Sequence, residues 1–175
     1  VLRESLDITR KIDYVRHIPL LLNDLAKALH QQGKSEEAHR CLHEALRQAR
    51  SNKDEPAIAE VLTTFAMIKI DTNDLTQAEN YLVRALSIGQ ALDDKSEILL
   101  QASRYFIKQG SLELGLQLAM FITNSAWKFV RDQSQELLAQ HGAAATLSAF
   151  LDLEFLNSST ELEKLTVKVL QETPL

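Results

Sequence analysis

The apolar positions of this chain recur at three- and four-residue spacing along most of its length, which is the pattern of amphipathic helices. Residues 42–50 read LHEALRQAR, residues 2–10 read LRESLDITR forty positions earlier, and residues 82–90 read LVRALSIGQ forty positions later. The apolar positions keep their register in all three segments. A fixed period of this length indicates a repeated helical unit. The sequence therefore predicts an all-α fold, an α-solenoid of antiparallel helix hairpins.

Each predicted unit has a small residue, a turn residue seven positions later, and a second small residue five positions after the turn. The turn residues are Gly33, Asn73 and Gly110, which are types that tolerate the left-handed backbone at a helix end. Small residues let two helix backbones approach closely. We therefore expect the hairpins to cross at three pairs of small residues, Ala26 with Ala38, Ala66 with Ala78, and Ser103 with Gly115.

Capping and proline signals predict where helices begin. Asp54 or Glu55, just before Pro56, marks one start. Pro19 falls in a periodic stretch and removes an amide donor, so we expect that helix to begin near His17. Hydroxyl side chains close to the next helix starts are candidate caps, and these are Ser35, Thr76 and Ser111.

The register also predicts how the chain is organised. One hairpin cannot bury its apolar face alone, so 1–175 is expected to be a single stacked domain. Leu2 matches Leu42 in register, so the sequence is expected to begin in the middle of a repeat and to be part of a larger protein. The predicted divisions are 1–11 as the second helix of a partial repeat, 15–52, 56–91 and 95–124 as hairpins, and 126–175 as a degenerate hairpin plus a capping helix.

Composition narrows the class of protein further. Only five Gly and three Pro occur in 175 residues. These are too few turn-forming residues for a β-protein with many strands and tight turns. The net charge of −5 argues against direct contact with nucleic acid. No apolar run is long enough to span a membrane, and no signal peptide is visible. We expect a cytoplasmic protein.

Candidate chemistry is sparse, and the sequence predicts no catalytic residues, no cofactor and no metal site. His39 and His43 stand four apart on a helix with Cys41 between them, which invites a metal-site interpretation. Cys41 points to a different face from the histidines, however, and no second ligand pair accompanies them. We therefore expect exposed helix histidines and a buried structural thiol. The paired carboxylates of the chain sit near helix starts or on polar faces, so we expect no enzyme activity in this segment.

The spacing of small residue, turn, Ala, Leu and Ala resembles the tetratricopeptide repeat. The positions that carry the resemblance over roughly 1–124 are Ala26, Leu29, Gly33, Ala38, Leu42 and Ala45. The early Trp and the closing Pro of that family are absent, and the repeat is longer than the family's usual 34 residues. The resemblance implies a right-handed superhelix that binds a protein or a peptide. Residues 112–138 also resemble the last repeats of bacterial multidomain signal-transduction (STAND) ATPases, including relatives of LuxR-type activators.

In the tetratricopeptide family the first helix of each hairpin forms the concave inner wall. Carrying the inward positions across predicts a partner-binding groove that contains Asn23, Lys27, His30, Thr63, Met67, Ile70, Arg104, Ile107 and Lys108. Its apolar strip has cations at both ends, which predicts an extended peptide, including an acidic segment, as ligand. The alternative interpretation is a solvated helix face that binds nothing.

The leading functional hypothesis is a protein-binding or peptide-binding module. It would be the interaction or sensor region of a larger bacterial regulatory protein, with a role in signal transduction and transcription regulation. Two alternatives stay open: a constitutive assembly scaffold, and a regulatory arm of a multidomain kinase or ATPase.

Overall fold

A computed structural model describes residues 17–89, 95–124 and 128–141, together with Glu4, Lys164 and Thr166. Within these residues the secondary structure is helical and no strand occurs. The elements are α2 (Ile18–Gln31), α3 (Ser35–Ser51), α4 (Glu55–Asp71), α5 (Leu75–Gly89), α6 (Ser96–Gln109), α7 (Leu112–Phe121), the short 3-10 helix η2 (Ile122–Asn124) and α8 (Lys128–His141). The predicted all-α class is confirmed.

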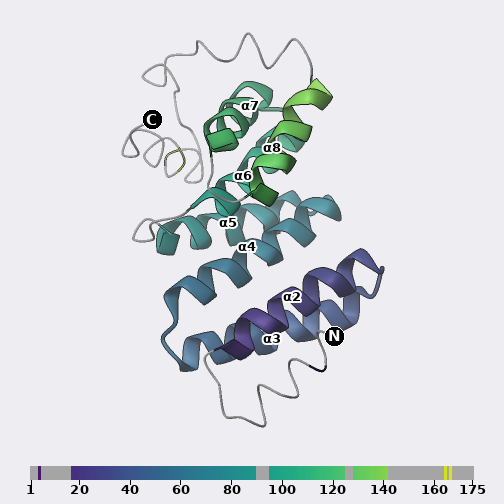
Figure 1. Cartoon of the computed structure of the whole chain (residues 1–175), viewed down its shortest axis with the longest axis vertical. Helices are drawn as coiled ribbons and strands as arrows, with labels where there is room; N and C mark the ends of the chain where they lie inside the picture. The colour runs from purple at the N-terminus through teal and green to yellow at the C-terminus, as the bar shows by residue number, and fades with distance from the viewer. Residues whose placement is uncertain are drawn as a thin grey trace.

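Successive helices pair into the hairpins α2/α3, α4/α5 and α6/α7, which follow one another along the long axis of the molecule (Figure 1). The first helices also touch in succession, α2 with α4, α4 with α6, and α6 with α8. They therefore form one continuous layer, and the molecule is a solenoid of helical repeats. α8 packs against both α6 and α7, so it occupies the place of the first helix of a further hairpin.

The turn inside each hairpin has the same geometry. Gly33, Asn73 and Gly110 have φ values of 75°, 61° and 102°, so all three adopt the left-handed conformation that the sequence predicted. The amide after each turn residue donates to a carbonyl five positions back, at 2.9 Å in all three hairpins. This bond satisfies a carbonyl at the helix end, as in the Schellman motif. Lys53, with φ 53°, adopts the same conformation between α3 and α4 and was not predicted.

Aspartates cap two of the helix starts. The carboxylate of Asp54 accepts from Ala57 N at 3.2 Å, and that of Asp74 accepts from Gln77 N at 3.3 Å. α2 begins at Ile18 with Pro19 in its first turn, so the predicted late start is confirmed. The predicted hydroxyl caps are wrong, because none of the three side chains makes the capping bond: Ser35 and Thr76 lie inside their helices, and Ser111 precedes α7 without such a bond.

The helix crossings hold small residues where the sequence placed them. Ala26, Ala38, Ala66 and Ala78 are fully buried. At the third crossing, Ser103 Oγ donates to the carbonyl oxygen of Gly115 at 2.5 Å. A Cβ atom added to Gly115 would lie 2.9 Å from the carbonyl oxygen of Ser103. α6 and α7 therefore approach each other so closely that glycine is required at this position.

Several predictions fall partly or wholly outside the described residues. The partial repeat at 1–11 and the capping helix expected near the end of 126–175 are among them. The single-domain division and the handedness of the superhelix stay predictions. None of the helices in the described part is both long and apolar enough to cross a membrane.

Candidate binding surface

The first helices α2, α4, α6 and α8 surround two hollows on one side of the layer, and we call this side the inner face. The first hollow has a volume of about 340 Å³ and lies among the amino-terminal parts of α4, α6 and α8. The second hollow, of about 390 Å³, draws its lining from all four first helices. Phe129 and Glu97 line both hollows.

The second hollow combines apolar, amide and charged side chains. Its apolar residues are Met67, Leu100, Phe129 and Leu137, its amides are Gln31, Gln101, Gln133 and Gln140, and its charged or titratable residues are Lys27, His30, Asp71, Glu97, Arg104 and Glu136. Within the described part of the chain, Phe129 is the exposed large apolar side chain, at 63%. The surface can thus bury an apolar group and also hydrogen-bond a peptide backbone.

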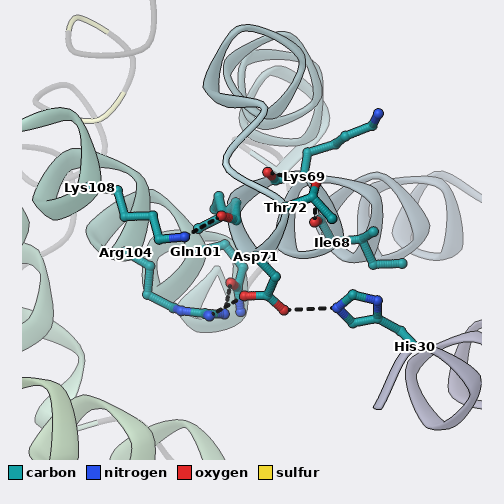
Figure 2. Close-up of polar contacts among 9 residues, drawn as sticks. His30, Ile68, Lys69, Asp71, Thr72, Gln101, Arg104 and Lys108 are labelled. Carbon is teal, nitrogen blue, oxygen red and sulfur yellow. Dashed lines mark hydrogen bonds and ion pairs between the residues drawn. The ribbon is translucent and has the colours of Figure 1, made fainter. Parts of the chain in front are cut away.

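Asp71 links three first helices. Its Oδ2 atom lies 3.0 Å from His30 Nε2 of α2, and its Oδ1 atom accepts from Arg104 Nη2 of α6 at 2.6 Å (Figure 2). Arg104 also donates from Nη1 to Gln101 Oε1 at 2.8 Å. We call the chain of contacts His30–Asp71–Arg104 the Asp71 bridge. It fixes the spacing of α2, α4 and α6 along one edge of the second hollow.

Lys108 acts at the carboxyl end of α4 beside this bridge. Its ammonium group donates to the carbonyl oxygen of Ile70 at 2.6 Å (Figure 2). Helix ends leave such carbonyls without partners and carry partial negative charge, so a cation there is favourable. Lys108 therefore stabilises the packing of α6 against α4.

A second polar cluster joins the same three helices nearer the first hollow. Lys27 Nζ lies 3.0 Å from Glu97 Oε1 and 3.7 Å from Glu60 Oε1. The amide of Asn23 donates to Glu60 Oε1 at 2.9 Å. One ammonium group is therefore shared by carboxylates from α4 and α6.

Burial and neighbouring charge shift the pKa values of this cluster. Burial raises the pKa of the Glu60 carboxyl, and the negative charges of Glu97 and Asp24 raise it further against the opposing effect of Lys27. Burial alone would lower the pKa of Lys27. Attraction to Glu97, Glu60 and Asp24 outweighs that effect, so the pKa of Lys27 is raised. The cluster thus holds Lys27 charged while it disfavours the charged form of Glu60.

Five of the nine predicted groove residues line the hollows. Lys27, His30, Met67 and Arg104 line the second hollow, and Thr63 lines the first. Asn23 and Ile70 line neither hollow and are fully buried, and Thr63 is itself only 1% exposed. The remaining two do not appear in either lining. Lys108 caps α4, and Ile107 packs where a Cβ on Gly115 would meet its side chain at 2.5 Å.

The three cations of the predicted groove all have partners within the protein. Lys27 and Arg104 are paired with carboxylates, and Lys108 bonds a carbonyl oxygen. The sequence reasoning missed these carboxylates and the whole contribution of α8. A signal was present in the helical register of the predicted groove residues. One further turn on α4 reaches Glu60 and Asp71, two turns before Arg104 on α6 reach Glu97, and the same spacing recurs in α8.

The two histidines of α3 contact an aromatic residue of α4. The ring centroids of His39 and His43 lie 6.3 and 5.2 Å from that of Phe65, and Phe65 stacks on Tyr81 at 4.9 Å. His39 Nδ1 lies 2.9 Å from the carbonyl oxygen of Ser35.

The expected buried thiol is only partly buried, since Cys41 packs at the edge of the core. Among the described residues, no three candidate ligands come together to hold a metal ion.

We compared the chain with known proteins and protein families. No curated protein and no solved structure matches the chain. A family model described as Tetratricopeptide repeat matches residues 17–91, the range that contains the hairpins α2/α3 and α4/α5. These two hairpins are therefore similar to tetratricopeptide repeats.

Proposed function

We propose that the inner face binds an extended segment of a partner protein in the second hollow. The observation that carries the proposal is the lining of that hollow, which combines apolar side chains, the exposed ring of Phe129 and accessible glutamine amides on Gln31, Gln133 and Gln140. Tetratricopeptide repeats in general mediate protein–protein interaction.

The proposed recognition follows from this lining. An extended segment exposes unpaired backbone N–H and C=O groups, and a primary amide can both donate to and accept from them. Alternate side chains of such a segment point to the same side. Apolar ones can therefore enter the hollow beside Met67, Leu100 and Leu137 while the amides hold the backbone. The proposal assigns no catalysis to these residues.

The wider context that we propose is the sensor or interaction region of a larger bacterial regulatory protein in the cytoplasm. Support comes from the similarity of residues 112–138 to the last repeats of signal-transduction ATPases, and from the Asp71 bridge. A ligand that displaces the bridge would alter the spacing of α2, α4 and α6, and hence the curvature of the array. A constitutive scaffold and the regulatory arm of a kinase or ATPase are the alternatives. Both would use the same surface.

An acidic segment is the ligand that Lys27, Arg104 and Lys108 suggested from the sequence. Their internal partners make such a ligand compete with Glu97, Asp71 and the carbonyl oxygen of Ile70. An acidic peptide is therefore one arm of the binding experiment.

The experiment is a selection of random dodecapeptides displayed on phage, followed by titration of synthetic versions of the selected peptides. Leu137→Ala, which removes apolar surface from the hollow, should weaken binding about tenfold. Leu138→Ala is the matched control, since Leu138 is as accessible but lies outside both linings. Bound peptide should raise the melting temperature as RT ln(1 + [L]/Kd) increases. Recovery of no peptide, or equal binding by both variants, would count against the proposal.

A further inference from the structure

We infer that the partner segment is basic: it places a lysine or arginine side chain against Glu136 and an apolar side chain against Phe129. The inference rests on the proposed function, because it specifies the chemistry of the ligand in the second hollow. It reverses the charge that the sequence alone suggested for that ligand.

The cations that line the hollow are already engaged. Lys27 is held by Glu97 at 3.0 Å and Arg104 by Asp71 at 2.6 Å, and both carboxylates also line the hollow. An acidic ligand would have to displace one of these carboxylates. A basic ligand leaves both ion pairs intact.

Glu136 differs from the other charged residues of the lining. It is an exposed residue of α8, and it has no ion pair within the part of the chain that the structure describes. With Lys27 and Arg104 against Asp71, Glu97 and Glu136, the lining has two cations and three carboxylates, so it carries one excess negative charge. His30 faces the same space from α2 and contacts Asp71.

Helix ends of both signs line the second hollow, so the backbone does not decide its charge. The last turns of α2, α4 and α8 line it through Gln31, Asp71 and Gln140, and the first turns of α6 and α8 through Glu97 and Phe129. The carboxyl end of a helix carries roughly half a negative charge and the amino end roughly half a positive charge, and Lys108 already binds the carboxyl end of α4. The excess of carboxylate side chains is therefore what complements a basic group.

Phe129 supplies the apolar part of the site and sets its spacing. It stands seven residues before Glu136 on the face of α8 that lines the hollow, with Gln133 between them. Seven residues of helix span about 10 Å, which an extended chain covers in about three residues. The expected ligand thus has an apolar residue and a lysine or arginine two to four positions apart, and Gln133 can bond the backbone between them.

The test uses the full chain and the same displayed dodecapeptides. Wild type should enrich peptides with the predicted spacing of apolar and basic residues. Against a synthetic peptide from that set, Glu136→Gln should weaken binding by about two- to fivefold, the range of an exposed ion pair. Glu136→Lys should weaken it more and should select acidic peptides instead. Phe129→Ala should weaken it about tenfold.

Glu36→Lys is the matched control, because it makes the same charge reversal on an exposed residue of α3, away from both hollows. It should bind as wild type does, and far-ultraviolet circular dichroism should show that every variant is folded. Enrichment of acidic or uncharged peptides, or unchanged binding of basic peptides by Glu136→Lys, would overturn this inference alone. Failure to recover any peptide would overturn the proposed function with it.

Discussion

Replacing Gly115 with alanine tests whether the close approach of α6 and α7 governs stability more than helix propensity does. Gly115 lies inside α7. On propensity alone, Gly→Ala within a helix should stabilise by about 1 kcal/mol. The structure predicts the opposite sign, because the new Cβ atom would lie 2.5 Å from Ile107 Cγ1 and 2.9 Å from the carbonyl oxygen of Ser103.

The magnitude follows from these contacts. The side chain of Ile107 can rotate away, but the oxygen of Ser103 belongs to the backbone of α6, so the two helices must separate. Overpacking of this kind costs roughly 1–3 kcal/mol. Separation also stretches the hydrogen bond from Ser103 Oγ to the carbonyl oxygen of Gly115. Weakening that bond adds about 1 kcal/mol, which offsets the gain in propensity of about 1 kcal/mol. We therefore expect Gly115→Ala to be destabilised by about 1–3 kcal/mol.

Urea unfolding followed by circular dichroism measures this difference. With a slope of about 2 kcal/mol per molar urea, the midpoint should fall by about 0.5–1.5 M. Gly89→Ala is the control, because among the described residues its Cβ would meet the end of the flexible Ile98 side chain, at 2.7 Å, and no backbone atom. That variant should lose much less stability. A midpoint for Gly115→Ala at or above that of wild type would refute the reasoning.

Three further predictions concern the turns and the polar clusters. Lys53→Gly should stabilise the protein by about 0.5–1 kcal/mol, since Lys53 has a φ of 53° that costs a non-glycine residue energy; an unchanged melting temperature would contradict this. The pKa of Glu60 is raised in the folded protein, so the folded state binds this proton more tightly than the unfolded chain does. The free energy of unfolding should therefore fall as the pH rises above 4.5, the ordinary pKa of a glutamate carboxyl. Glu60→Gln should flatten that fall in urea midpoints measured from pH 4 to pH 7. Asp71→Asn should lose about 0.5–2 kcal/mol through its contacts with His30 and Arg104, and its melting temperature should depend less on salt than that of wild type.

Local signals in the sequence were enough to predict the repeat. Gly33, Asn73 and Gly110 adopt the left-handed conformation, and the small residues at the crossings are buried, because each of these constraints arises within one hairpin. Lys53 has the same conformation and was missed, since a lysine gives no signal for it. The hydroxyl caps failed because Asp54 and Asp74 stand one residue before the helix starts and make the capping bonds.

The site was harder to predict, because its properties depend on contacts between different hairpins. Lys27 and Arg104 looked like unpaired cations on their own helices. Their partners Glu97 and Asp71 are 70 and 33 positions away in sequence. Helical periodicity shows which residues share a face but not which faces meet. The role of α8 was missed for the same reason, since its packing against α6 is visible only in three dimensions.

The Asp71 bridge also limits how freely the units of this array can be exchanged. Asp71 stands two residues before the turn at Asn73, and the equivalent positions in the neighbouring hairpins are Gln31 and Lys108. Neither carries a negative charge, so neither can form the ion pair that Asp71 makes with the guanidinium group of Arg104. A duplicated, deleted or reordered hairpin would therefore leave His30 or Arg104 facing the wrong side chain. In an array of identical units any hairpin could replace another. Here the hairpins must keep their order, and a hairpin cannot be inserted or removed next to α4/α5 without breaking the Asp71 bridge.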